Sequence, residues 1–202
     1  MALEEKNTPD QPRAKEPWQK TVVLYLHDLV HLLMVLIVIF VLVFRLIVVS
    51  GDSMYNTLVD GDYLLLLSNV FYREPEAGDI VVISKEAFDN GAPIVKRVIA
   101  TEGQIVDIDF VNAIVYVDGL PLEEPYIYTP TTVDEGMAFP VIVEKGSILV
   151  LGDNRQVSLD SRSPSIGLID KREVLGKALV LLLPGNNHGK SAQDFSRIGV
   201  IK

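Results

Sequence analysis

Residues 29–54 read LVHLLMVLIVIFVLVFRLIVVSGDSM, and this stretch decides how the chain is organised. The run Leu29–Val49 is apolar apart from one histidine and one arginine. At about 1.5 Å per residue, a helix of this length crosses the roughly 30 Å hydrocarbon core of a bilayer. The run ends at a glycine turn that presents the hydroxyl of Ser53. The sequence therefore predicts a transmembrane anchor over 22–49, with a candidate nucleophile beside the lipid surface.

Two alternatives to a permanent anchor stay open. A cleaved signal peptide has a shorter apolar region of roughly 7–15 residues, although the small residues Val48 and Ser50 would permit cleavage before Gly51. A buried helix of a soluble protein is less consistent with the sequence, because the apolar surface is continuous on every face.

The charges around the apolar run predict its orientation. Four basic residues precede the run, and after Arg45 no lysine or arginine occurs before Arg73. Because positive charge marks the cytoplasmic end of membrane helices, we expect a single-pass protein of the cell membrane with a cytoplasmic N-terminus and an extracytoplasmic domain. Residues 1–21 are polar and contain three prolines, which predicts a disordered cytoplasmic tail.

The composition excludes several classes of function. The chain has 202 residues, with 18 Lys and Arg against 27 Asp and Glu, and its net charge of −9 arises wholly after Ser50. An acidic domain argues against nucleic acid as a partner, since that affinity depends on neutralising phosphates with basic side chains. The absence of cysteine excludes disulfides and thiolate catalysis.

Downstream of the anchor, residues 50–183 contain short β-rich runs separated by Gly, Pro, Asn and Asp. Asp118-Gly119 is a tight-turn signal. Many short strands with little helix predict a mainly β fold, an all-β barrel or sandwich, with a small inserted β subdomain at about 101–145. Residues 184–202 form a polar tail to which the sequence assigns no role. The candidate strands are Tyr63–Leu67, Ile80–Ser84, Ile94–Ala100, Ile105–Ile108, Ile114–Val117, Val141–Val143, Ser147–Leu151 and Ala178–Leu183.

The three histidines limit the available chemistry. His27 and His31 lie in the anchor region and His188 in the tail, so none falls within the predicted β domain. A Ser-His-Asp triad needs an imidazole beside the nucleophile, and zinc hydrolysis usually needs two or three histidine ligands. His27 and His31 are four residues apart and could chelate an ion, but solvation at the membrane interface is the simpler interpretation.

A serine can still be activated by a neutral lysine that has been stripped of water. Lysine has an ordinary pKa of about 10.4 and a working base one of roughly 7–8, a difference that burial can supply. Of the seven lysines after Ser50, only Lys96 lies in a strongly apolar run, and strand alternation sends Arg97 to the opposite face. The alternative is an edge-strand lysine that prevents aggregation.

A third group of polar residues follows the run Ser147–Leu151. Residues 152–162, GDNRQVSLDSR, hold two aspartates, two arginines and two serines. Bidentate Arg–Asp bonding can lock such a loop, and Ser158 could orient an amine. An ordinary solvated surface turn is the alternative.

Together these segments resemble the type I signal peptidases, the membrane-bound serine endopeptidases that remove signal peptides from exported proteins. The resemblance runs from the anchor to about Leu183. Residues 50–58, SGDSMYNTL, resemble the nucleophile box of that family. Residues 95–100, VKRVIA, with Gly103 resemble its lysine box, and residues 152–162 resemble its late signature.

The resemblance implies a role for each residue of these boxes. Ser53 would be the nucleophile, Lys96 the general base, and Ser158 the hydroxyl that orients the lysine amine. The backbone N–H of Ser53 would contribute to the oxyanion hole. The residues that would brace the loop around the amine are Asp153, Asp160 and Arg162.

Two positions depart from the pattern of the family. Gly51 stands where some members supply a second hydroxyl for the oxyanion hole, so another donor must come from the backbone or be missing. Asn56 stands where members usually carry proline, which leaves the turn looser.

The resemblance also implies the reaction and the partners. We expect a serine endopeptidase with a Ser-Lys dyad, without metal or cofactor, that cleaves preproteins after small residues. Its partners would be signal peptides of secreted preproteins, membrane lipid and the secretion machinery. A catalytically weak or inactive relative that assists assembly of secreted or pilus subunits is the alternative that Asn56 leaves open. A self-cleaving Ser-Lys protein akin to SOS-type repressors is disfavoured by the anchor and by the lack of a DNA-binding segment.

Overall fold

The computed structural model describes residues 18–86, 91–186 and 193–201. The chain divides into two compact units, one up to Phe40 and the other from Val41 onward. Residues 1–17 of the predicted disordered tail lie outside the described residues. Residues 18–21, the last four of that predicted tail, are helical. The predicted polar tail lies outside them at 187–192 and 202.

The described part of the first unit is helical and belongs to helix α1, Trp18–Val43, whose last three residues fall in the second unit. None of its 26 residues is buried, and leucine, isoleucine, valine and phenylalanine occupy all of its faces. In the described part of the chain it is the one helix long and apolar enough to cross a membrane. Its length and composition therefore fit a membrane anchor.

The helix ends six residues before the end of the apolar run that predicts it, which continues to Val49. It ends at Val43, and strand β1, Phe44–Val48, follows directly and pairs antiparallel with β2, Tyr63–Ser68. The expectation of one helix through residue 49 is therefore wrong at its C-terminal end. Hydropathy cannot separate a helix from a strand in a short apolar run, and here the edge of β2 offers hydrogen-bond partners to β1.

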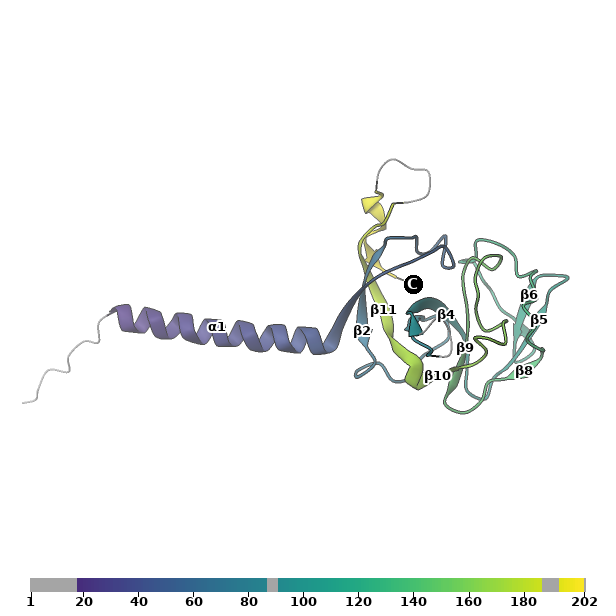
Figure 1. Cartoon of the computed structure of the whole chain (residues 1–202), viewed down its shortest axis with the longest axis horizontal. Coiled ribbons are helices and arrows are strands. Elements are labelled where there is room, and N and C mark those ends of the chain that lie inside the picture. The colour runs from purple at the N-terminus through teal and green to yellow at the C-terminus, as the bar shows by residue number, and fades with distance from the viewer. Residues whose placement is uncertain (1–17, 87–90, 187–192, 202) are drawn as a thin grey trace, which may run out of the picture. The chain divides into compact units, whose positions relative to one another are not determined.

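The second unit is built on an eight-stranded antiparallel sheet that curls around a buried core (Figure 1). Strand β11 is central, because it pairs with β2, β3 and β12. In spatial order the strands are β1, β2, β11 (Val174–Leu183), β3 (Ile80–Ile83), β4 (Ile94–Thr101), β9 (Ser147–Leu151) and β10 (Ile169–Asp170), with β12 (Gly199–Val200) added to β11.

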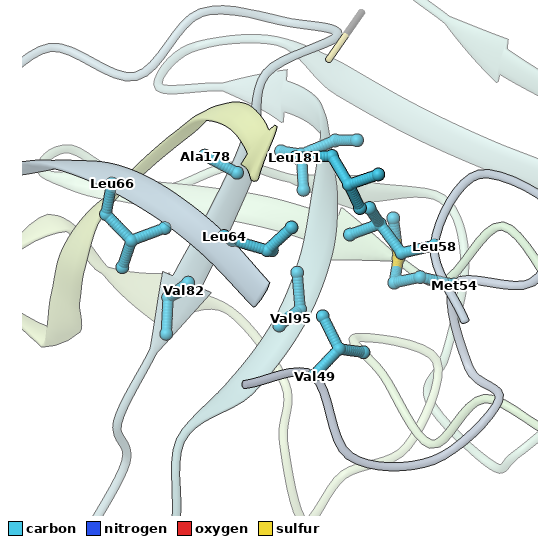
Figure 2. Close-up of a cluster of buried hydrophobic side chains, with 10 residues drawn as sticks. Val49, Met54, Leu58, Leu64, Leu66, Val82, Val95, Ala178 and Leu181 are labelled. Carbon is cyan, nitrogen blue, oxygen red and sulfur yellow. The ribbon is translucent and has the colours of Figure 1, made fainter. Parts of the chain in front are cut away.

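One apolar cluster inside this sheet positions the loop that follows β1. Figure 2 shows Met54 and Leu58 from that loop beside Leu181 of β11. Met54 and Leu58 are each about as buried as a side chain can be, with 1% of their surface exposed. Burying such side chains contributes roughly 1.5–3 kcal/mol each, so the loop is anchored to the core on both sides of residue 56.

A smaller four-stranded sheet forms between β4 and β9 in the chain. Asp118 and Gly119 both have positive φ, 52° and 77°, and join two of its strands by the tight turn that the sequence predicts. A shared apolar cluster packs this sheet against β4 and β9, and Figure 1 shows β5, β6 and β8 gathered beside β9. In spatial order the strands are β7 (Leu120–Pro121), β6 (Ile114–Val117), β5 (Ile105–Asp109) and β8 (Val141–Ile142).

The mainly β prediction is confirmed, and all eight candidate strands are present. Four further strands, β1, β7, β10 and β12, were not predicted. Strands β7, β10 and β12 have two residues each, too few to carry a period-two pattern. Strands β1 and β12 also lie outside the predicted bounds of 50–183, so the folded β unit is longer than the predicted domain.

Candidate active site

Ser53 lies on the loop between β1 and β2, residues 49–62, called the nucleophile loop below. Leu58 N–H donates to the Met54 carbonyl at 2.8 Å, so the residues after Ser53 form a helical turn. Because both of these side chains are buried in the core, the turn has little freedom to move. The hydroxyl of Ser53 is thus presented from a fixed backbone.

Gly51 shapes this loop through its backbone. Its φ is +82°, a conformation that side chains with a Cβ rarely adopt, and its N–H donates to the Asp60 carboxylate at 2.8 Å. The Gly51 N–H is therefore bonded to Asp60 and is not available as an oxyanion donor. The backbone N–H of Ser53, in contrast, makes no hydrogen bond to any described residue, so it can serve as an oxyanion donor.

Lys96 contacts the candidate nucleophile directly. It projects from β4, and its Nζ donates to Ser53 Oγ at 2.7 Å. The side chain is 3% exposed, and burial lowers the pKa of Lys96 to about 8, against smaller opposing effects of Asp160 and Glu135. The alternative of a solvated edge-strand lysine is wrong, because β4 lies between β3 and β9 in the sheet.

Arg97, the next residue of β4, was not predicted as part of the site. Its guanidinium forms a bidentate ion pair with Asp153 at 2.9 and 2.8 Å and lies 4.0 Å from the centre of the Tyr126 ring. Asp153 therefore braces its loop as predicted, through an ion pair with Arg97 of β4 and not with an arginine of its own loop. The signal was in the sequence, since a charge inside an apolar strand needs a buried partner.

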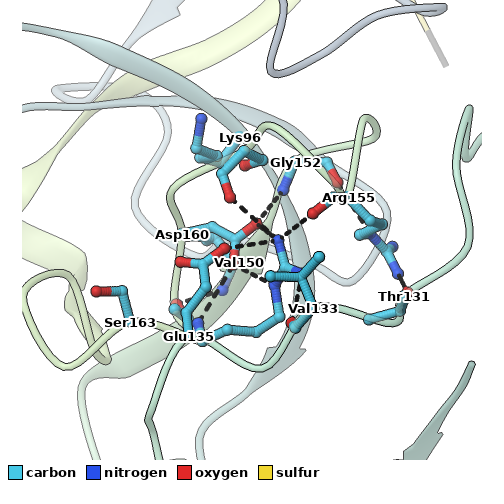
Figure 3. A network of polar contacts seen from close by, with 12 residues as sticks. Lys96, Thr131, Val133, Glu135, Val150, Gly152, Arg155, Asp160 and Ser163 are labelled. Carbon is cyan, nitrogen blue, oxygen red and sulfur yellow. Dashed lines mark hydrogen bonds and ion pairs between the residues drawn. The ribbon is translucent and has the colours of Figure 1, made fainter. Parts of the chain in front are cut away.

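Asp160 and Arg162 brace the loop of residues 152–162, called the late loop below, as predicted. Arg162 Nε and Nη2 each bond the Asp160 carboxylate at 2.9 Å, and Asp160 also accepts from the Gly152 N–H at 3.0 Å (Figure 3). Neither side chain is exposed. Arg162 bonds the carbonyls of Arg155 and Ser158 as well. The alternative of a solvated surface turn is therefore wrong.

Gly152 is where the late loop and the nucleophile loop meet. A Cβ placed on it would lie 2.2 Å from Ser158 Oγ and 2.5 Å from the Ser53 carbonyl oxygen. No side chain fits in that space. Asn154 ties the two loops together, because its N–H donates to the Ser53 carbonyl at 3.0 Å and its amide to the Asp52 carbonyl at 3.2 Å.

Ser158 is brought to the site without the expected hydrogen bond. It is 2% exposed, and its Oγ has no partner among the described residues. It therefore does not bond the Lys96 amine in this structure. A buried hydroxyl without a partner is rare, and such groups are often found where a reaction supplies the partner.

Two acidic residues of the inserted region also reach the late loop and were not predicted as site residues. Glu124 pairs with the fully buried Arg155 at 2.5 Å. Glu135 pairs with Arg162 at 3.0 Å, while its second oxygen is buried without a partner among the described residues, and burial raises the pKa of Glu135. The segment around Glu135 carries no periodic pattern, so only its position in space identifies it.

The arrangement is suited to acyl transfer. A buried amine of lowered pKa beside a serine hydroxyl can remove the proton of that hydroxyl, and an unused backbone N–H lies at the same residue. Among the described residues, no group of three or more His, Asp or Glu side chains could hold a metal ion.

The family model and the relatives found by sequence point to the same family. The family model described as "Signal peptidase, peptidase S26" matches residues 22–183. The chain is 34% identical over 187 residues to a "Probable signal peptidase I-1" of Synechocystis sp., covering 86% of this chain and 88% of that protein. It is 34% identical over 197 residues to "Signal peptidase I T" of Bacillus subtilis, covering 91% and 96%. A crystal structure of a signal peptidase I from Enterococcus faecalis V583 matches at 26% identity with a TM-score of 0.42, covering 52% of this chain and 96% of that chain.

Proposed function

Because the chain belongs to the signal peptidase family, peptidase S26, and is a type I signal peptidase, a serine endopeptidase that removes signal peptides from preproteins, we propose that Ser53 and Lys96 are its catalytic dyad. The observation that carries this proposal is the 2.7 Å contact between Lys96 Nζ and Ser53 Oγ, made by a lysine that is 3% exposed.

The first step is acylation. Neutral Lys96 accepts the proton of the Ser53 hydroxyl while Ser53 Oγ attacks the scissile carbonyl carbon of the preprotein. The protonated Lys96 then gives its proton to the departing amine of the mature protein, and the signal peptide stays on Ser53 as an ester. The lowered pKa of Lys96, about 8, supports this role, because a fraction of the amine is neutral near pH 7.

The second step releases the signal peptide. A water molecule beside Lys96 gives up a proton to the amine and attacks the ester carbon, and Lys96 returns that proton to Ser53 Oγ. In both steps the negative oxygen of the tetrahedral intermediate is stabilised by the free backbone N–H of Ser53. During both steps the Lys96 amine exchanges protons with Ser53 Oγ and with the departing amine or the water. The Ser158 hydroxyl forms a hydrogen bond with the Lys96 amine and so orients it.

The substrate class places this chemistry at a membrane. We assign α1 as the anchor, with the N-terminus cytoplasmic and the β unit outside, since a signal peptide emerges from the same bilayer. Membrane lipid and the secretion machinery are the further partners of this proposal. The non-catalytic alternative finds no support in the described residues. Asn56 is followed by Thr57, whose hydroxyl bonds Asp153, so the turn is secured without proline.

The test is a cleavage assay with detergent-solubilised full-length protein and a synthetic signal-peptide substrate, with products mapped by mass spectrometry. We expect one cut after a small residue, abolished in both Ser53→Ala and Lys96→Ala. The matched controls are Ser84→Ala, whose hydroxyl bonds the Gly91 carbonyl, and Lys177→Ala, whose amine pairs with Asp79. Undiminished cleavage by purified Ser53→Ala or Lys96→Ala would refute the dyad.

A further inference from the structure

We propose that Arg197 is a positioning residue for catalysis: it clamps the nucleophile loop shut through Asp62 and Thr57 and so holds Ser53 against Lys96. Arg197 belongs to the C-terminal region for which the sequence offered no role. The inference rests on the proposed function of Ser53.

The nucleophile loop is closed at its base by backbone hydrogen bonds. Val49 N–H donates to the Asp62 carbonyl at 2.8 Å, and Gly61 N–H donates to the Val49 carbonyl at 2.9 Å. The Asp62 carboxylate lies at this closure with none of its surface exposed. It accepts the N–H of Val59 at 2.8 Å and that of Gly185 at 2.7 Å. The loop therefore closes around a buried negative charge.

Arg197 supplies the positive charge for this carboxylate. Its two terminal nitrogens bond the two oxygens of Asp62 at 2.9 and 2.7 Å, the bidentate geometry that favours arginine. In the part of the chain that the structure describes, this is the one ion pair of Asp62. A buried carboxylate that loses such a partner is strongly destabilised, so the closed base depends on Arg197.

Arg197 also reaches the other limb of the loop. Its Nη2 donates to the Thr57 carbonyl at 3.3 Å, and the Thr57 hydroxyl bonds the Asp153 carboxylate. Asp153 in turn pairs with Arg97, the neighbour of Lys96 on β4. A continuous series of bonds thus runs from Arg197 through the nucleophile loop to the strand that carries the base.

The segment that carries Arg197 is itself fixed to the core. Strand β12 pairs with β11, Ile201 N–H donates to the Leu179 carbonyl at 3.0 Å, and the Ile201 side chain packs on the cluster of Figure 2. Arg197 and the nucleophile loop also line one hollow of about 300 Å³. The segment that carries the clamp is therefore held by β11 as well as by the apolar cluster that it shares with the loop.

Loss of the clamp should act on the reaction and not on substrate affinity. Among the described residues, the side chain of Arg197 bonds only Asp62 and Thr57. In Arg197→Ala the loop opens more often, so we expect kcat to fall about tenfold or more while KM changes less than about twofold. Water entering beside Lys96 raises its pKa, so the acid limb of the kcat profile moves up by about half a pH unit.

The experiment compares full-length Arg197→Ala, Arg197→Lys and the control Arg172→Ala in detergent, at a temperature where circular dichroism shows each protein folded. Arg172 forms the same kind of bidentate pair, with Asp170, on a surface where its side chain is 90% exposed. We expect unchanged kinetics in Arg172→Ala and partial recovery of kcat in Arg197→Lys. A folded Arg197→Ala with kcat within about twofold of wild type, or with an unshifted pH profile, overturns the proposal.

A second variant covers the case in which Arg197→Ala fails to fold. The double variant Asp62→Asn, Arg197→Gln removes both charges and leaves two amides that can bond each other. Wild-type kcat in this protein overturns the clamp. A kcat that is reduced at least about fivefold at unchanged KM supports it. Activity remaining in Ser53→Ala would instead overturn the proposed function, whatever Arg197 does.

Discussion

Lys96 and Arg97 are neighbours on β4 and are almost equally buried, with 3% and 2% of their surfaces exposed. They face opposite sides of the strand and meet opposite surroundings. Arg97 has a bidentate carboxylate, the Gly78 carbonyl at 2.9 Å and the face of Tyr126. The Lys96 amine has one hydrogen bond to the described residues, to Ser53 Oγ.

The difference shows how one strand places a brace on one side and the proposed base on the other. Burial disfavours an unpaired charge, and partners offset that cost. Arg97 is paired with Asp153 and so fixes the late loop. Lys96 lacks such an ion pair among the described residues, and its pKa falls to about 8. About a tenth of the amine is then neutral at pH 7, against fewer than about one in a thousand for an ordinary lysine.

The largest effect is expected for Lys96→Met, which keeps the volume and removes the amine. Activity should fall about 10⁴-fold or more. Stability should move the other way, by about 3 kcal/mol at pH 7, because the pKa of Lys96 is lower in the folded protein. The cost of burying the ammonium is fully present below about pH 8 and fades as the pH rises toward the ordinary lysine value. Urea unfolding at pH 7 and pH 10 measures this.

The control for that stability gain is Lys177→Met, a lysine whose side chain is 32% exposed and paired with Asp79. It should gain no stability and lose no activity. Equal stability of Lys96→Met and wild type at pH 7 would mean that Lys96 bears no burial cost, and the contrast with Arg97 would disappear.

Arg97→Gln removes the ion pair that distinguishes Arg97 from Lys96. It leaves the carboxylate of Asp153 buried without its cation, so the free energy of unfolding should fall by about 3–5 kcal/mol. Arg97→Lys should recover only part of this loss, because an ammonium cannot reproduce the bidentate pair. Thermal and urea unfolding give the values, with Arg172→Gln as the exposed control. A loss below about 1 kcal/mol would show that the pair does not brace the fold.

Ser158→Ala tests whether Lys96 acquires a partner only during the reaction. Because Ser158 Oγ has no hydrogen bond to lose, stability should change by less than about 1 kcal/mol. If the hydroxyl orients the amine, kcat should still fall about tenfold. Ser163→Ala is the control, since its hydroxyl bonds Ser165 nearby. Unchanged kcat in Ser158→Ala would remove this residue from the mechanism.

The smallest effect is expected for Glu135→Gln. The charged groups acting on Lys96 are Asp160, Glu135, Arg162 and Asp153, and the acidic ones raise the pKa of the amine against burial. In wild type, kcat/KM should rise with pH up to about 8, as Lys96 loses its proton. Glu135→Gln should move this rise to lower pH by less than about one unit, while the exposed Glu144→Gln leaves it in place. A shift to higher pH would contradict the assigned influence of Glu135.

The sequence was sufficient to predict the central pair of the site. Histidine and cysteine are absent from the candidate strands and one lysine lies within an apolar strand, which made Ser53 and Lys96 candidates, and the resemblance to the signal peptidases paired them. The late loop was predicted as well, because Asp160 and Arg162 are two residues apart and bond each other locally. Local patterns and the family resemblance together predict this much of the site.

The remaining features depend on contacts between distant segments. Whether Asp153 pairs with Arg162 or with Arg97 is decided by the packing of β4 against the late loop, which no local pattern encodes. The end of α1 at Val43 has the same origin, since only the edge of β2 makes the following residues a strand. Glu135 and Arg197 lie in segments without periodicity, and their partners became evident only in three dimensions.

The clamp at Asp62 has a consequence for the timing of activity in a newly made chain. Asp62 and Arg197 are separated by 135 positions. At about 5–20 residues per second, a ribosome adds Arg197 roughly 7 to 30 seconds after Asp62. On the roles proposed above, the nucleophile loop lacks its clamp until Arg197 is added, although Ser53 and Lys96 are both made before it. A chain that has not yet been extended to Arg197 is therefore expected to cut signal peptides more slowly than the folded protein, although it contains both Ser53 and Lys96.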